Sequence, residues 1–177
     1  MPEFCDIDAT YKLADNLLNV LAKGASDRLG GIEFGRAYVA FDEPVADVCC
    51  DGGQLTVHAT NIRPSVDNYG DGTVCVTGWE VDLVVTTYQC YPTGVLADGE
   101  TPIPAAEMDT ASEYAYRVGH ALYYTAFKAV TDGTVYPDGE IDRALMRKPV
   151  RLGDLQALSQ QETCVGWRFT LTLDYDI

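Results

Sequence analysis

The fold of this chain is decided most clearly by the stretch VGWRFTLTLDYD, which occupies residues 165–176. Bulky apolar side chains alternate there with glycine, arginine, threonine and aspartate, and a period of two is typical of a half-buried strand. The apolar set is Val165, Trp167, Phe169, Leu171, Leu173 and Tyr175. The pattern predicts a final strand over 164–176 that has one face on a core, so other strands must flank it.

Similar alternation earlier in the chain predicts those neighbouring strands, near residues 36–42, 55–60, 77–90 and 150–158. The first is expected to place on one face Ala37, Val39 and Phe41. The second is expected to place toward the core Leu55, Val57 and Ala59, and toward solvent Thr56, His58 and Thr60. The end of the third is apolar on both faces, so we expect it to be covered on both. Segments 64–75 and 91–104 are rich in turn-forming residues and predict loops.

Two segments have the period of a helix. The first spans about 8–23, where Asp8 is the expected N-cap and Gly24 the expected stop. Its apolar stripe consists of Leu13, Leu17, Val20 and Leu21. The second follows the 91–104 loop and ends near Val130, with an apolar face of Met108, Ala111, Ala115, Val118, Leu122 and Ala129. A short third helix is predicted near 138–147.

The second helix is aromatic well beyond its apolar face. The additional side chains are Tyr114, Tyr116, Tyr123, Tyr124 and Phe127. They fit either a thickly packed core or a second contact face against a neighbouring subunit, for which Tyr116 and Tyr123 are the candidate residues. Together these elements predict a single α+β domain over 1–177, with two main helices packed on a mostly antiparallel sheet of about five strands.

The charge balance limits the classes of function. Twenty-seven acidic residues against twelve basic ones give a net charge of −15. This disfavours a general nucleic-acid binder, because affinity for the phosphate backbone comes mainly from Lys and Arg. Solubility alone explains such a charge, but so does a channel wall that repels passing DNA. No apolar run reaches the roughly 20 residues of a membrane helix, and the N-terminus lacks the pattern of a secretory signal, so we expect synthesis in the cytoplasm.

Six cysteines, at positions 5, 49, 50, 75, 90 and 164, include no C-x-x-C pair. For a cytoplasmic protein we expect buried, reduced thiols. The alternative is a thiol cluster or a disulfide that joins Cys49 or Cys50 to Cys90, although sequence cannot choose among the 15 full pairings.

Motifs for catalysis or metal binding are missing from the sequence. There are two histidines, His58 and His120, and there is no nucleophile elbow, phosphate loop or zinc-protease signature. The segment 67–72 resembles a calcium loop only faintly, because Tyr69 stands where an oxygen ligand is needed. We therefore expect no cofactor, no metal and no enzymatic activity.

One group of basic residues stands out in this acidic chain: Arg143, Arg147, Lys148 and Arg151 lie within nine positions. Such a group is either a solvated patch or a docking site for an acidic surface of another copy or a partner, where charge sets the register.

The order of features over almost the whole chain resembles that of tail terminator proteins from long-tailed phages of actinobacteria. The series begins with the N-terminal helix and the strand at 36–39, continues through Cys49-Cys50 and 53–57, and then through Arg63-Pro64. It goes on through 79–81 and 89–92 to the long helix, and closes with the strand at 165–173. The loops at 61–75 and 91–104 carry no matching feature.

This resemblance implies a structural role in the virion and no catalytic residues. Terminator subunits form a ring, usually of six copies, on the head-proximal end of the tail tube. The ring stops tube growth and joins the head connector, and DNA passes through its centre without sequence-specific binding. Its expected partners are other copies, the tail tube protein and the connector or stopper protein; its expected location is the virion tail, after assembly in the host cytoplasm. Asp67 and Asp71 are then the expected pore-facing acids.

Other roles remain open at this stage. A head–tail stopper, adaptor or minor tail protein shares the same chemistry and differs in what it touches. A small carbohydrate-binding module or enzyme belongs to a different class, and the tyrosines and many acids fit it only loosely. A cytoplasmic acidic interaction protein is the third alternative.

Overall fold

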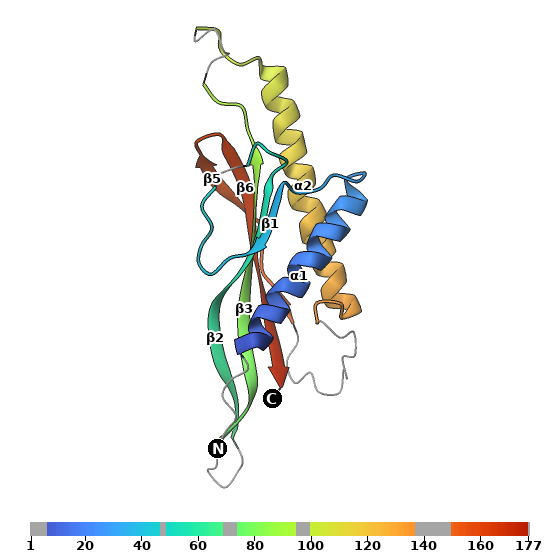
Figure 1. Ribbon diagram of the computed structural model, residues 1–177, viewed down its shortest axis with the longest axis vertical. Coiled ribbons are helices and arrows are strands. Elements are labelled where there is room, and N and C mark those ends of the chain that lie inside the picture. Colours follow the sequence, from blue (N-terminus) through green and yellow to red (C-terminus); the bar gives the residue numbers. More distant parts are fainter. Residues whose placement is uncertain (1–6, 47–48, 69–73, 95–99, 137–149, 177) are drawn as a thin grey trace.

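Two helices lie together on one face of a six-stranded sheet in the computed structural model (Figure 1). The structure describes residues 7–46, 49–68, 74–94, 100–136 and 150–176. The helices are α1 (Ile7–Arg28) and α2 (Ala105–Asp132). The strands are β1 (Arg36–Val39), β2 (Gln54–Asn68), β3 (Val74–Cys90), β4 (Arg151–Leu152), β5 (Gln156–Gln161) and β6 (Cys164–Asp176). The predicted α+β class is confirmed, with six strands where about five were expected.

The sheet is antiparallel except at one edge. Its strand order is β1-β2-β3-β6-β4, and β5 also pairs with β6. β1 runs parallel to β2, whereas β2–β3, β3–β6, β4–β6 and β5–β6 are all antiparallel. The predicted final strand is therefore β6, which lies between β3 on one side and β4 and β5 on the other.

The core fills the space between the helices and the sheet. Leu55, Val81, Leu83 and Leu171 are fully buried on the sheet side, and Leu17, Leu21, Val118 and Leu122 are fully buried on the helix side. These positions belong to the stripes and alternating faces that the sequence predicts, because those faces must leave water together.

Helix α1 does not stop at Gly24 as predicted. It continues to Arg28, because Ala25 extends the buried stripe by one turn and is fully buried itself. Gly24 is instead a contact point between the helices: a Cβ added there would lie 2.3 Å from Cγ2 of Thr125 on α2. The helix ends before Gly30 and Gly31, which both have the left-handed backbone that favours glycine.

The predicted loop at 64–75 is also wrong in part. β2 extends to Asn68 and β3 begins at Val74, so the two strands form a long hairpin that projects beyond the helices (Figure 1). Pro64 lies within β2, opposite Trp79. A proline is tolerated there because β1 pairs only with residues 54–57, which leaves this part of β2 at the sheet edge.

The outer face of β2 is not exposed near its start. Thr56 and His58 are 0% and 4% exposed, although we predicted that they point toward solvent. The chain leaves the sheet after β1, and residues 40–46 turn back over this face, where Gln54 donates a hydrogen bond to the carbonyl of Val45 (3.2 Å). Phe41 therefore does not share a strand face with Ala37 and Val39 as predicted, because β1 ends at Val39, and Phe41 is 100% exposed. The prediction that the end of β3 is covered on both faces is confirmed, since Val84 and Tyr88 are buried.

Candidate interaction surfaces

The outer face of α2 carries an aromatic stripe, which we define as Tyr116, Tyr124 and Phe127. Their spacing, i, i+8 and i+11, places them on one side of the helix. They are 56%, 53% and 57% exposed, whereas Val118 and Leu122 on the opposite side are fully buried. His120, which is also exposed, lies between Tyr116 and Tyr124 on the same side of the helix. Three large rings on one exposed helix face are typical of a contact surface rather than of scattered surface residues.

Neighbouring groups hold parts of this stripe in place. The guanidinium of Arg28, from the end of α1, lies 4.0 Å from the ring centroid of Tyr124. The ring of Tyr116 packs against Trp167 of β6 at 5.1 Å between centroids. Ordered aromatic side chains lose little further entropy on binding, which favours their use as interface anchors.

Tyr123 has a different position from Tyr116, although both were predicted interface residues. Its ring meets Phe169 edge-on at 5.4 Å, and its hydroxyl donates a hydrogen bond to the carbonyl of Gly153 (3.0 Å). Tyr123 therefore ties α2 to the sheet within one molecule, and only Tyr116 of the pair belongs to the exposed stripe.

Gly119 and Trp167 form a contact that sequence reasoning missed. The indole Nε1 of Trp167 donates a hydrogen bond to the carbonyl of Ala115 (2.9 Å), and the ring lies against Gly119. A Cβ at position 119 would lie 2.6 Å from Cδ1 of the indole. A glycine inside a long predicted helix is the available signal, since such a residue often marks a close packing contact.

On the opposite side of the sheet, residues 40–46 form what we call the acidic loop. Phe41 and Val45 are 100% and 72% exposed, and Asp42 and Glu43 lie between them. The loop is held by four contacts: the Ala40 amide donates to the carbonyl of Val57, the Glu43 amide to the Asp42 carboxylate, Gln54 to Val45, and Glu43 pairs with Arg168 at 3.0 Å. It is therefore an ordered projection that displays two apolar side chains.

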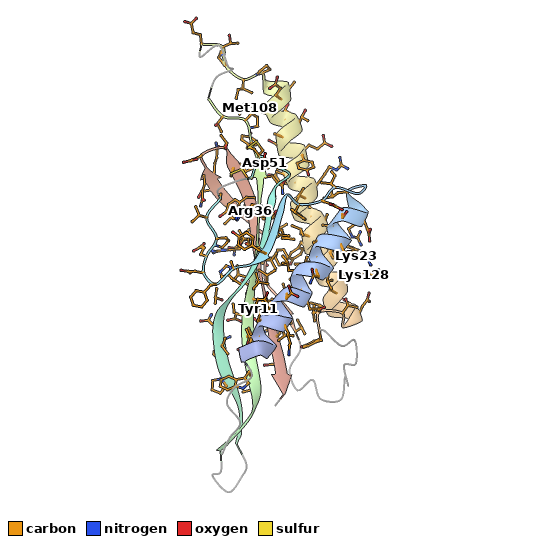
Figure 2. All side chains as sticks on the ribbon, viewed as in Figure 1. Tyr11, Lys23, Arg36, Asp51, Met108 and Lys128 are labelled. Carbon is orange, nitrogen blue, oxygen red and sulfur yellow. A yellow bond between two sulfur atoms is a disulfide. The ribbon has the colours of Figure 1, made fainter. Side chains whose placement is uncertain are left out.

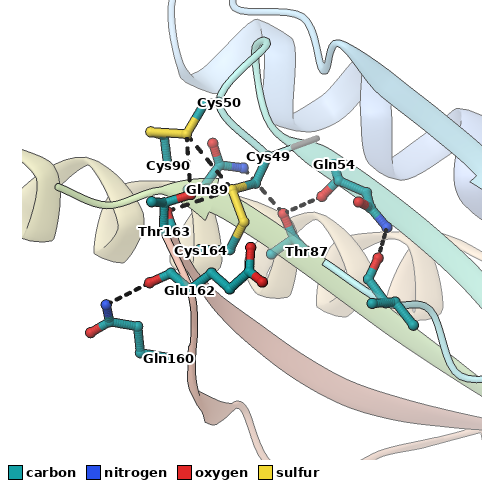
Figure 3. Close-up of a disulfide and its surroundings, with 11 residues drawn as sticks. Cys49, Cys50, Gln54, Thr87, Gln89, Cys90, Gln160, Glu162, Thr163 and Cys164 are labelled. Carbon is teal, nitrogen blue, oxygen red and sulfur yellow. Dashed lines mark hydrogen bonds between the residues drawn. A yellow bond between two sulfur atoms is a disulfide. The ribbon is translucent and has the colours of Figure 1, made fainter. Parts of the chain in front are cut away.

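Two disulfides lie where the chain returns from the acidic loop to β2 (Figure 3). Cys49–Cys164, the inner disulfide, joins two cysteines that are each 3% exposed. Cys50–Cys90, the outer disulfide, joins two exposed residues. The reduced thiols that we expected are therefore not what the structure has. The Cys50–Cys90 bridge is one of the alternatives raised above, whereas Cys164 was not considered.

The register of the sheet explains this pairing. Cys90 and Cys164 are directly opposite each other on β3 and β6, so the adjacent residues 49 and 50 can each reach one of them. The Cα–Cα distances of 6.0 Å and 4.4 Å lie within or at the limit of the usual range for disulfides. The two bonds fasten the end of the acidic-loop segment to both central strands.

The predicted basic docking group is only partly described. Arg143, Arg147 and Lys148 lie outside the described residues. The fourth member, Arg151, has a 63% exposed side chain and pairs with Glu80 at 2.9 Å. It thus belongs to a charge network within the same molecule.

That network covers the sheet face opposite the helices, where the hairpin begins to project. Arg63 pairs with Glu80 at 2.5 Å and with Asp82 at 3.0 Å. The hydrogen bond to Glu80 is the main cause that raises the pKa of Arg63. Burial by itself would raise the pKa of Asp82, but hydrogen bonds from Thr172 and Asn61 and the charge of Arg63 outweigh it, so that pKa is lowered. Both shifts favour the charged forms of Arg63 and Asp82, the two groups that face each other at 3.0 Å.

The structure describes one of the two predicted pore-facing acids. Asp67 lies near the end of β2, opposite Cys75 in the projecting hairpin. Asp71 lies outside the described residues. The structure therefore places only Asp67 of this pair.

His58 lies beneath the acidic loop. The pKa of its imidazole is lowered, mainly because the group is buried. The nearby carboxylates of Glu43 and Asp42 act in the opposite direction and raise this pKa, whereas the charge of Arg168 lowers it. Next to it, a cavity of about 290 Å³ is lined by Thr60, Val84, Gly153, Asp154, Gln156, Arg168, Phe169 and Thr170. Its lining has one carboxylate, so it offers no carboxylate pair for sugar hydrolysis.

Comparison with known proteins does not identify a family for this chain. No protein-family model and no curated protein matches the chain. Within the described ranges, no group of three or more His, Cys, Asp or Glu side chains is arranged to hold a metal ion. No helix among the described residues is both long and apolar enough to cross a membrane.

Proposed function

We propose that this protein is a tail terminator: a structural subunit that forms a ring on the head-proximal end of a phage tail tube, ends tube growth and presents the joining surface to the head. The resemblance in the order of sequence features suggests this class, and an α+β domain with two helices on a mostly antiparallel sheet is compatible with it. In this role the protein acts through its surfaces and needs no catalytic group.

The aromatic stripe is the observation that carries the proposal. Tyr116, Tyr124 and Phe127 are each more than half exposed on a rigid helix. Exposed aromatic side chains on one helix face are a feature of interfaces, because Tyr and Phe rings supply a large contact area at small entropic cost. A subunit of a ring must bury surface against its neighbours, and the stripe offers such a surface.

The net charge of −15 also supports a ring through which DNA passes. Like charge opposes unspecific contact between subunits and weakens contact between the ring wall and the DNA phosphates. A head–tail stopper would share these properties, so the experiment must distinguish the two by location.

The test uses cognate tail tubes assembled without heads, incubated with the purified protein and an antibody label, and viewed by electron microscopy. We expect label at one end only, opposite the tail tip, and tubes that stop lengthening. Label on DNA-filled heads but not on tubes would replace the terminator with a stopper. Binding to neither structure would refute both roles.

A pair of matched variants makes the test specific for the stripe. Tyr124→Ser with Phe127→Ser should abolish tube capping, because it removes two of the three exposed rings. Tyr11→Ser is the control, because Tyr11 is 57% exposed on the other helix, outside the stripe. Equal loss of capping in the control and the stripe variant would refute the assignment.

A further inference from the structure

We propose that the acidic loop of one copy docks on the aromatic stripe of the next copy, so that the two surfaces form a head-to-tail interface. The inference rests on the proposed ring only for the choice of a second copy as the partner. It names the two contacting surfaces and the orientation of neighbouring subunits, which the proposed function leaves open.

The acidic loop has the features of an anchor. The side chain of Phe41 is fully exposed, and Val45 beside it is 72% exposed. The loop backbone is fixed by its hydrogen bonds to Val57 and Gln54, and its far end is fastened by the inner and outer disulfides. A rigid projection of this kind binds without first paying an ordering cost, which raises affinity.

The aromatic stripe has complementary chemistry. Its rings are flanked on α2 by the exposed cations Arg117 and Lys128, and Arg28 lies over Tyr124. Lys128 lies on the helix side of the molecule, away from the sheet (Figure 2). Phe41 and Val45 are apolar and can pack against the rings. Asp42 and Glu43 carry the charge opposite to that of the flanking cations. Complementary charge at the rim of an apolar contact sets its register.

Three of the charged groups in this match are available, whereas Glu43 already pairs with Arg168. Among the described residues, Arg117, Lys128 and Asp42 form no ion pair within the molecule. In a chain with twenty-seven acids and twelve bases, most surfaces of two copies repel each other. A region where cations border exposed rings is therefore a favourable place for the acidic loop of another copy.

The two surfaces lie on opposite sides of the same molecule, so they cannot meet within one copy. Trp167 and Phe169 of β6 contact α2, and Arg168 between them points to the other face, where it pairs with Glu43 of the acidic loop. Figure 1 shows the helices on one side of the sheet and the segment that follows β1 on the other. Contacts between two different patches on opposite sides propagate from copy to copy and close into a ring when the rotation allows it.

Photo-crosslinking tests the contact directly. A photoreactive analogue, p-benzoylphenylalanine, replaces Phe41, which as a fully exposed residue tolerates substitution without loss of the fold. The variant is irradiated in concentrated solution and on capped tail tubes, and the crosslinked peptides are mapped by mass spectrometry. We expect crosslinks between chains that fall on 116–128. Crosslinks between chains elsewhere, or none in either sample, would overturn the proposal.

The same analogue at Ile62 is the matched control, because Ile62 is 50% exposed on β2 and belongs to neither surface. It should give at least tenfold fewer crosslinks to 116–128 than the analogue at Phe41. Equal yields from the two positions would show unspecific contact and overturn the proposal.

Mixing of two variants tests the head-to-tail orientation. Phe41→Ser with Val45→Ser removes the loop anchor, and Tyr124→Ser with Phe127→Ser removes the stripe. Each variant alone should lose self-association at least tenfold relative to the wild type. An equimolar mixture should regain dimers by analytical ultracentrifugation, because one copy keeps its stripe and the other its loop. The mixture should form no species larger than a dimer. A mixture that stays as monomeric as either variant alone would overturn the proposal.

These results are separable from the proposed function. Wild-type protein that caps tubes while position 41 crosslinks outside 116–128 leaves the terminator role standing and removes this interface. Crosslinks on 116–128 without tube capping retain the interface and remove the terminator role.

Discussion

The contact between Gly119 and Trp167 predicts that Gly119→Ala destabilises the protein, although the same change stabilises most helices. Within a helix, alanine is favoured over glycine by about 1 kcal/mol. At this position the added Cβ would lie 2.6–2.7 Å from three atoms of the indole ring. Contacts under 3.0 Å force a shift, and the indole cannot move freely, because its Nε1 donates a hydrogen bond to the carbonyl of Ala115.

The magnitude follows from three opposing effects. Overpacking a well-filled site costs about 1–3 kcal/mol, and weakening the Trp167 hydrogen bond costs about 1 kcal/mol more. The helix preference for alanine returns about 1 kcal/mol. We therefore expect the free energy of unfolding to fall by about 1–3 kcal/mol, which for a chain of this size corresponds to roughly 2–12 °C in Tm.

Urea unfolding with both disulfides intact, followed by tryptophan fluorescence, measures this change. Glu113→Ala on the exposed side of α2 is the control and should change the free energy of unfolding by less than about 0.5 kcal/mol. In a Trp167→Leu background the alanine at position 119 should become neutral or stabilising, because the clash is gone. A Gly119→Ala protein at least as stable as the wild type would refute the packing argument.

Three further predictions concern the disulfides and the buried charges. A mild reductant followed by alkylation and mass spectrometry should label the exposed outer disulfide before the buried inner one; the reverse order would contradict the assigned exposure. Because burial lowers the pKa of His58 in the folded protein below its ordinary 6.5, its contribution to stability is complete above that pH and is lost as the pH falls further. Between pH 7 and pH 5 the wild type should therefore lose free energy of unfolding relative to His58→Gln. A constant difference between the two proteins would contradict this. Thr172→Val removes a 2.7 Å hydrogen bond to Asp82, so it should cost about 1–2 kcal/mol at pH 7 and raise the pKa of Asp82, measurable by carboxyl NMR titration; an unchanged pKa would show that Arg63 and Asn61 suffice.

The parts of the fold that follow a simple period were predictable from the sequence. β6 and the buried stripes of both helices each present one face to the core, so burial leaves a regular trace in the residue order. The ends of elements were less predictable. Gly24 is a usual stop signal, yet here the absence of a side chain serves the approach of Thr125, a contact more than a hundred residues away.

The surfaces were harder to predict than the core. Thr56 and His58 alternate like exposed residues, and only the acidic loop, which crosses them from another part of the chain, makes them buried. The partner of Cys49 depends on the register of β3 and β6, which no local pattern encodes. Tyr116 and Tyr123 are indistinguishable by residue type and lie only about 20° apart around the helix. Their different roles come from the side chains and carbonyls that each meets two turns apart, Trp167 for Tyr116 and Phe169 with Gly153 for Tyr123.

The inner disulfide also determines how the protein responds to mechanical load. It joins positions 115 residues apart, so a force applied at the two ends of the chain passes through the covalent bond and bypasses everything between them. Roughly 400 Å of extended chain, at about 3.5 Å per residue, cannot be pulled out while that bond is intact. Only the segments before residue 49 and after residue 164 can unravel, which leaves α2, β2 and β3 protected from stretching.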